Sequence, residues 1–199
     1  MLFRSAEEIA DGETLLKCAP PIRGRSEREA LCRALAAGEL TLVASDHSPA
    51  SRELKLAGRG DFSAAWGGIA SLQLTLPAVW TAMSPHVGDL AGFVCRALSE
   101  EPARLAGLFG PEGGKGAIAP GFAADLVAFD PAAHWTVDQE LLLHRHKLTP
   151  YHGRELVGRV MATWLRGRKV FDCVEINTPR MGRWLRRNAP PVDPASALA

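Results

Sequence analysis

The chain contains 199 residues, of which 47% are hydrophobic and 23% charged, a composition typical of globular proteins. Its formal net charge of +1 argues against nucleic-acid binding, which needs a broad basic field. No apolar run approaches the roughly 20 residues that span a bilayer. The length allows one or two domains but is short of the about 250 residues of a complete α/β barrel. The start has no signal-peptide pattern and the four cysteines form no CxxC pair, so we expect a cytoplasmic protein with reduced thiols.

The first part of the chain is expected to contain an extended segment followed by a helix. The paired prolines within Lys17–Arg23 favour an extended backbone, because proline does not fit a helix interior. Residues Ser26–Glu29 have the spacing of a capping box, which predicts a helix start there and a stop near Gly38. The apolar positions that recur at helical spacing are Leu31, Ala34 and Leu35.

The apolar run Leu40–Ala44 ends abruptly in the polar residues Ser45–Pro49. This pattern is typical of a buried parallel strand with polar side chains at its carboxyl end, and the order of segments favours a βαβ unit. Because α/β barrels place their chemistry at such strand ends, Asp46 is the first candidate catalytic residue. The alternative is that Asp46 only turns the chain after the strand, as aspartate commonly does.

A long polar loop, residues 51–66, separates this strand from a helical region. Loops of this length in compact domains are usually functional or disordered. The loop ends in Gly67 and Gly68, which allow the backbone to approach a ligand or a packed neighbour. Three helices are expected next, at about residues 69–83 with a bend at Pro77, at about 89–98, and from Ser99 to about 107 with Pro102 in the first turn.

The sequence changes character near residue 110, where a glycine-rich stretch leads to a predicted strand at Asp125–Phe129. Residues 160–165 and 170–174 are predicted to form two strands joined by a tight turn. We therefore expect a small β module after an α/β part. Residues 177–199 are basic and then rich in proline and alanine, which predicts a solvated tail, with binding of an acidic partner as the alternative.

Four segments have counterparts, in the same order, in a known family. They are KCAPPIR (17–23), ASDHSP (44–49), the stretch from SEEPARLAGLFG to AADLVAFDP (99–131), and HKLTPYHGRELVGRVMATWLRGRKVF (146–171). In these segments the chain resembles the C-terminal portion of cyclic amidohydrolases. Within that family the motifs SDHSP, WGGIASLQ and HKLTPY resemble those of allantoinases.

The resemblance implies an α/β fold that is an incomplete (β/α)8 barrel, with residues 1–109 as its C-terminal portion and 110–176 as part of a β-sandwich. It also implies hydrolysis of a cyclic amide with two divalent metal ions, zinc or alternatively cobalt or manganese. Asp46 matches the family's aspartate, whose implied roles are to bind one metal ion and to accept a proton during attack on the ring. A carboxylate suits both roles, as an oxygen ligand and as a base.

Neighbouring residues take implied roles from the same resemblance. His47 would contact and support the aspartate without binding the metal itself, with a hydrogen-bonded core histidine as the alternative. Ser48 would offer backbone groups to the ring amide, and Gly67 and Gly68 match a segment that approaches the substrate with its backbone. Ala19 stands where dihydroorotases carry an asparagine that recognises the substrate carboxylate. Alanine there argues against dihydroorotate and suits an uncharged ring such as allantoin.

Most of the metal ligands that the resemblance implies are missing. The family uses an HxH pair on the first strand, a carboxylated lysine and two further histidines, and only the aspartate has a counterpart here. His144 and His146 have HxH spacing but lie in the C-terminal segment, so we interpret them as structural or surface residues. One aspartate does not hold a divalent ion tightly, because such ions take about four to six ligands.

We therefore expect this chain to be inactive by itself, either as a truncated product or as a partner of an N-terminal barrel fragment, with a homo-oligomer as a further partner. Three functions stay open. The first is hydrolysis of allantoin to allantoate, a step of purine catabolism. The second is the hydrolysis of another ring by a hydantoinase or dihydropyrimidinase relative. The third is a non-catalytic scaffold or assembly module that has lost the site.

Overall fold

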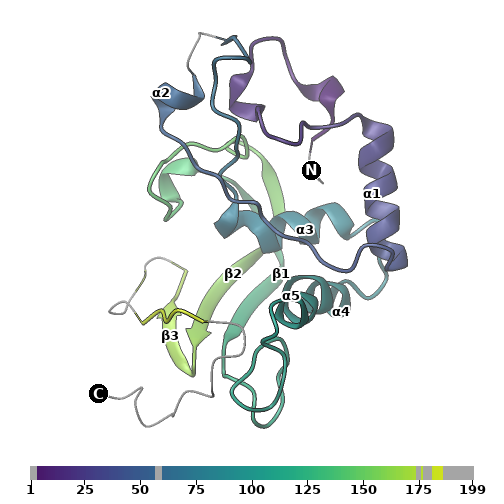
Figure 1. Cartoon of the computed structure of the whole chain (residues 1–199), viewed down its shortest axis with the longest axis vertical. Helices are drawn as coiled ribbons and strands as arrows, with labels where there is room; N and C mark the ends of the chain where they lie inside the picture. The colour runs from purple at the N-terminus through teal and green to yellow at the C-terminus, as the bar shows by residue number, and fades with distance from the viewer. Residues whose placement is uncertain (1–3, 57–59, 174–175, 177–180, 186–199) are drawn as a thin grey trace.

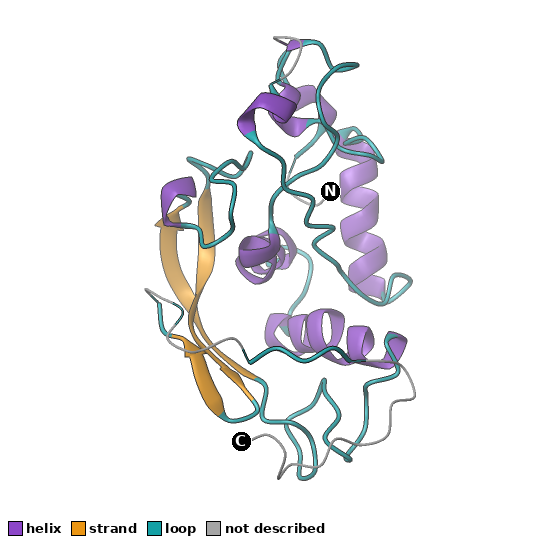
Figure 2. Ribbon diagram, turned by 60° about the vertical axis from the view of Figure 1, so that its left-hand side comes forward, coloured by secondary structure: helices purple, strands orange, loops and turns teal. Residues whose placement is uncertain are grey.

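The computed structural model describes residues 4–56, 60–173, 176 and 181–185. Short helices and loops come first, and one antiparallel sheet follows them along the chain (Figures 1 and 2). The elements are η1 (Ala6–Glu8), η2 (Thr14–Leu16), α1 (Arg25–Ala37), α2 (Arg52–Lys55), η4 (Leu72–Leu74), α3 (Thr75–Met83), α4 (Leu90–Cys95), η5 (Arg96–Glu100), α5 (Glu101–Leu105), β1 (Leu126–Thr136), η6 (Gln139–Leu141), β2 (Glu155–Leu165) and β3 (Arg168–Phe171).

Helix α1 begins one residue before the predicted capping box. Its N-cap is Gly24, and no side chain of the helix caps it. Both carboxylate oxygens of Glu7 accept the Arg25 N–H at 3.1 Å, so the free amide is satisfied from outside the helix. The predicted capping box at Ser26–Glu29 is therefore wrong. The predicted stop is confirmed, because Gly38 ends the helix with a φ of 78° that glycine adopts without strain.

Residues 40–44 do not form the predicted buried parallel strand. Leu40 and Ala44 are exposed, and the Val43 N–H donates to the carbonyl of Ala97, a helical residue. The nearest parallel pairing is a single bridge between His47 and Ile69. A strand needs hydrogen-bonded neighbours along its length, and no other described residue supplies them. The expected βαβ unit is therefore absent from the described residues, and only an extended segment with the single His47–Ile69 bridge takes its place.

The helical region also departs from the prediction at its joins. The first helix starts with a 3₁₀ turn, η4, so that Pro77 lies in the first turn of α3. An N–H group at this position would have no partner within α3, so proline fits there. The other two predicted helices form one run from α4 to α5, joined by the π-helical turn η5. The predicted break at Ser99 is absent. The wider turn lies just before Pro102, which has no N–H to donate to the preceding turn.

The sheet has the order β1-β2-β3, and both pairings are antiparallel. β1 runs to Thr136, well beyond the predicted Phe129, with irregular register around Asp130. The predicted hairpin is confirmed, but β2 begins at Glu155 and not at 160, and β3 begins at Arg168 and not at 170. The turn is therefore limited to Arg166–Gly167, whose positive φ angles of 50° and 79° are those of a tight hairpin turn. β3 ends at Phe171, and Val174 of the predicted strand lies outside the described residues.

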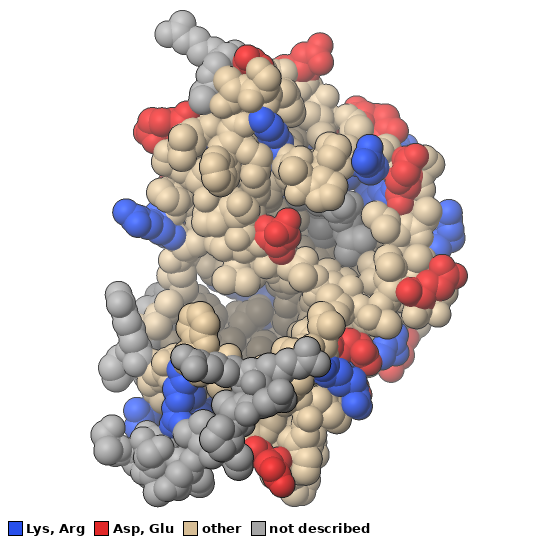
Figure 3. Space-filling view, in the orientation of Figure 1, with Lys and Arg blue, Asp and Glu red and all other residues tan. Residues whose placement is uncertain are grey.

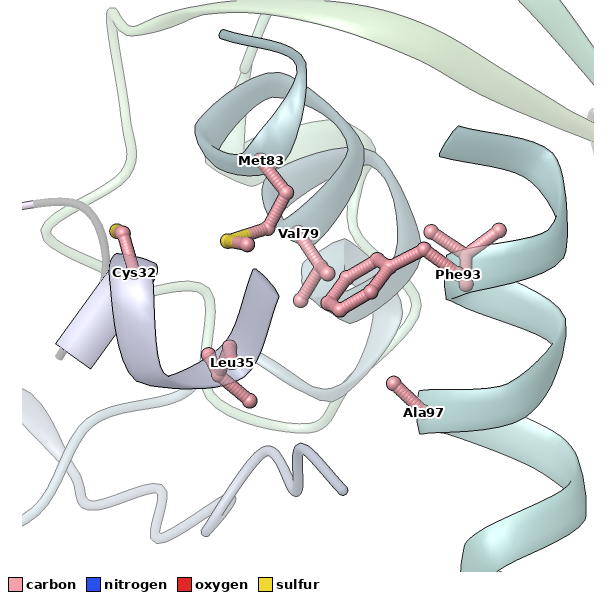
Figure 4. Close-up of a cluster of buried hydrophobic side chains, with 7 residues drawn as sticks. Cys32, Leu35, Val79, Met83, Phe93 and Ala97 are labelled. Carbon is pink, nitrogen blue, oxygen red and sulfur yellow. The ribbon is translucent and has the colours of Figure 1, made fainter. Parts of the chain in front are cut away.

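Helix α3 contributes side chains to both hydrophobic clusters found among the described residues. On one side Val79 and Met83 pack with α1 and α4 (Figure 4). On the other side Leu74 of η4 and Ala78 pack with β1, β2 and the segment between them; the other members of that cluster are Ile69, Val137, Leu142, Tyr151 and Leu156. This position fixes the segment before α3, which contains Gly67 to Ser71, against the body of the protein.

The surface agrees with the low net charge. On the face shown in Figure 3, the described acidic and basic side chains are scattered, without a continuous field of one sign. Among the described helices, none has the length and apolar composition required to cross a membrane. Of the predicted tail, only residues 181–185 are described, so the prediction for 177–199 falls largely outside the described residues.

Candidate functional site

The segment Ser45–Ser48 lies directly beside the segment that precedes α3. The Ser48 N–H donates to the Ile69 carbonyl at 3.0 Å, and the Ser71 hydroxyl donates to the Ser45 carbonyl at 3.1 Å. Two motifs separated by about twenty residues in the sequence therefore meet through their backbones. The structure brings together the site residues that the sequence predicted in SDHSP and in WGGIASLQ.

Asp46 lies in this segment with an exposed side chain and a φ of 44°. This left-handed backbone is uncommon for residues other than glycine, and aspartate and asparagine tolerate it best. The chain turns sharply at this residue. The carboxylate is thus presented to solvent at the edge of the site.

The ring of His47 is fixed by hydrogen bonds to a helix start. Its Nδ1 accepts the N–H groups of Ser71 and Leu72, both at 3.0 Å. These amides lie at the start of η4, where backbone donors lack helical partners. An Nδ1 that accepts two N–H groups holds no proton, so we place the proton of the neutral ring on Nε2. His47 therefore connects the segment around Asp46 to the start of α3, and its support of a metal ligand stays a prediction.

His144 lies edge-on to His47, with 5.7 Å between ring centroids and 62° between planes. Both ring nitrogens of His144 are buried and have no hydrogen-bond partner within the described part of the chain. Burial lowers the pKa of His144 below its ordinary value, which favours the neutral imidazole. Of the HRH motif, one histidine is thus packed beside the candidate site.

Gly68 is in close contact with Ser48. A Cβ atom at Gly68 would lie 2.5 Å from the Ser48 Oγ and 2.7 Å from its carbonyl oxygen, so only glycine fits without a shift. Gly67 differs, because its nearest neighbour would be the Lys17 Cε at 3.8 Å. Gly67 is exposed, and its N–H and C=O make no hydrogen bond to any described residue. The pair therefore combines a packed glycine with one whose peptide groups are open.

Lys55 is a buried residue of this region that no sequence pattern indicated. Its side chain is 3% exposed, and its Nζ donates to the carbonyls of Lys17 at 2.5 Å, Gly68 at 2.6 Å and Trp66 at 3.1 Å. Burial lowers the pKa of Lys55 to about 8. A lone lysine in a polar loop gives no sequence signal of this role, because its burial depends on the segments folded around it.

A third motif, HKLTPY, reaches the same region from the other end of the chain. The Thr149 hydroxyl, which is fully buried, donates to the Ala70 carbonyl at 2.7 Å. Just before this motif, the Leu143 N–H donates to the Gln73 side-chain oxygen at 2.7 Å. The three motifs that resemble those of allantoinases therefore converge on one part of the fold.

The donor set does not hold a metal ion by itself. Among the described residues, no three side chains of His, Cys, Asp or Glu lie together as a metal site. Asp46 supplies one exposed carboxylate, whereas divalent ions take about four to six ligands. The residues present therefore do not fit the metal centre that the resemblance implies.

Comparison with solved structures defines the class of the fold. A D-hydantoinase (dihydropyrimidinase) from Thermus sp. matches 86% of the chain with a TM-score of 0.76 and 28% identity. An L-hydantoinase (dihydropyrimidinase) from Arthrobacter aurescens matches 89% with a TM-score of 0.79 and 26% identity. The chain thus has the fold of part of a hydantoinase, the counterpart covering 37% and 39% of those chains.

Sequence comparison gives the particular relatives. The chain is 43% identical to the allantoinase of Streptomyces avermitilis over 94% of its length, 44% to that of Arabidopsis thaliana over 84%, and 42% to that of Saccharomyces cerevisiae over 84%. In sequence the chain is therefore similar to part of each of these allantoinases. It spans 40%, 32% and 35% of these three relatives. No protein-family model matches the chain.

Proposed function

We propose that this chain contributes to an allantoinase-type hydrolase that opens the ring of allantoin to give allantoate, a cytoplasmic step of purine catabolism. In this proposal residues 1–109 are the C-terminal portion of a (β/α)8 barrel and residues 110–176 are part of a β-sandwich. The observation that supports it most strongly is the meeting of the Asp46–Ser48 segment with the Gly67–Gly68 backbone, in a chain that is over 40% identical to three allantoinases.

Each residue of the site has a chemical task in this reaction. The Asp46 carboxylate accepts the proton released when water attacks the ring carbonyl, as a general base does. The carbonyl of Ser48, whose N–H is already donated to Ile69, and the open peptide groups of Gly67 bind the ring amide. Peptide N–H and C=O groups suit an uncharged ring amide, because the amide also carries one kind of donor, N–H, and one kind of acceptor, C=O.

The complete enzyme, in this proposal, depends on two divalent metal ions, of which zinc is the first candidate and cobalt or manganese the alternatives. This chain supplies one ligand, Asp46, and the other ligands come from further polypeptide. Trp66 and Leu72, which are adjacent in sequence to Gly67 and Ser71, are 49% and 62% exposed, which supports coverage of this region by additional chain. We expect the 199-residue chain alone to have no turnover.

Reconstitution tests this function. The chain is co-expressed with the part of the Streptomyces avermitilis allantoinase that it does not match, and the purified complex is assayed for metal content and for turnover of allantoin. We expect turnover and bound zinc, cobalt or manganese in the complex, and neither in the chain alone. A stable complex that binds no metal and leaves allantoin intact would contradict the proposal and favour a non-catalytic scaffold.

The second candidate is a hydantoinase or dihydropyrimidinase activity, because the two solved structures compared above are of that class. The same complex separates the two candidates when it is given allantoin, unsubstituted hydantoin and dihydrouracil in parallel. Preference for hydantoin or dihydrouracil over allantoin would replace the first proposal with the second.

A further inference from the structure

Lys55 is a charged side chain buried without an ion-pair partner among the described residues. It is the last residue of the four-residue helix α2 and is 3% exposed. An isolated buried ammonium is costly unless every N–H group is satisfied. A buried lysine is therefore expected only where an uncharged side chain could not make the same hydrogen bonds.

The three donors of the ammonium are all used. They bind the carbonyls of Lys17, Trp66 and Gly68, which belong to two separate segments of the chain. An ammonium carries three N–H groups and no acceptor, so three carbonyls that converge on one point match it. A side chain without these donors would leave the Trp66 and Gly68 carbonyls without their hydrogen bonds to Lys55.

Both backbone polar groups of Gly68 are hydrogen-bonded in this arrangement. Its carbonyl accepts from Lys55, and its N–H donates to the Lys17 carbonyl at 2.9 Å. Lys17 adds a second clamp, because its own Nζ donates to the Ala65 carbonyl at 2.5 Å. The loop before α3 is therefore hydrogen-bonded to Lys17 at Ala65 and at Gly68, on either side of the exposed Gly67.

We propose that Lys55 is a positioning residue for substrate binding, which fixes Gly68 so that the open peptide groups of Gly67 face an uncharged ring amide. This inference rests on the proposed hydrolase function. Lys55 does not touch the substrate or the reacting atoms; it acts through the Gly67–Gly68 backbone. Its loss is therefore expected to weaken substrate binding more than the chemical step.

The first arm of the test uses the chain by itself and no activity. Amide hydrogen exchange is measured in the wild type, in Lys55→Met and in the exposed control Lys169→Met. We expect the Gly68 amide to exchange at least tenfold faster in Lys55→Met, while amides of α3 keep their wild-type protection. Lys169→Met should leave both regions within twofold of wild type.

Two results of this arm overturn the inference. One is unchanged exchange at Gly68 in Lys55→Met, and the other is an equal loss of protection in α3, which indicates general unfolding. Should Lys55→Met not fold, reductive methylation of the wild type decides. Lys55 must then react at least tenfold more slowly than Lys169, and equal reaction rates would overturn the inference.

The second arm uses the reconstituted complex and steady-state kinetics on allantoin. We expect Lys55→Met to raise KM about tenfold with kcat within about threefold of wild type, and Lys55→Arg, which keeps the charge and several donors, to recover part of that loss. A fall in kcat with unchanged KM overturns the positioning role. A wild-type complex without turnover overturns the proposed hydrolase function and with it the substrate role, whereas the exchange arm still decides whether Lys55 fixes the loop.

Discussion

Gly68 is packed so closely on Ser48 that a single added methyl group would lie 2.5 Å from the serine Oγ. The contact joins the backbone that follows Asp46 to the loop before α3. It depends on the absence of a side chain, since the φ of Gly68 is not among the positive values. Gly68 therefore does not accommodate a side chain, whereas the adjacent Gly67 has room for one.

Gly68→Ala should lower the free energy of unfolding by about 1–3 kcal/mol, because the added atom forces the two segments apart. Gly67→Ala is the matched control, since its Cβ would meet nothing closer than 3.8 Å. Urea unfolding of both variants measures the difference. Equal stabilities for the two variants would show that the segments do not pack as described.

Thr149→Val should lower the free energy of unfolding by about 1–3 kcal/mol, because the nearly isosteric side chain leaves the Ala70 carbonyl without its buried donor. The present bond is 2.7 Å long and the threonine is fully buried. Thr149→Ser keeps the hydroxyl and loses only a methyl group. A Val variant as stable as the Ser variant in urea would contradict this account.

The titration of Lys55 predicts that stability rises with pH above neutrality. The amine has a pKa of about 8 in the folded chain against 10.5 as its ordinary value, so the unfolded chain binds more protons between these values. The gain should reach about 2 kcal/mol between about pH 7.5 and 9.5. Burial raises the pKa of Tyr151 to about 12, which opposes this trend only above its ordinary value near 10.

Urea unfolding across this pH range measures the effect as the difference between wild type and Lys55→Met. The control Lys169→Met should follow the wild-type curve. A difference between wild type and Lys55→Met that stays constant with pH would exclude Lys55 as the titrating group.

Asp46→Asn in the reconstituted complex should reduce turnover of allantoin by at least about 100-fold, because the amide is not a base. Asparagine tolerates the left-handed backbone of φ 44° as aspartate does, so the fold should be kept. Initial rates measure the loss, and the circular dichroism spectrum controls for folding. Turnover within a fewfold of wild type would remove Asp46 from the catalytic role.

The sequence by itself determined the elements whose signals are local. Gly38 ends α1 and Arg166–Gly167 closes the hairpin, because positive φ angles favour particular residues whatever surrounds them. The motifs around Asp46, Gly67 and Thr149 were also sufficient to indicate the relatives. Each of these signals lies within a few consecutive residues.

Only the tertiary structure decided which distant groups complete one another. The cap of α1 comes from Glu7, the segment 40–44 lacks the neighbours that a strand requires, and Lys55 is buried by three carbonyls from two other segments. Hydrogen bonds across such sequence separations depend on how the chain packs. A lysine is recognised as a buried clamp only when the carbonyls that surround it are in place.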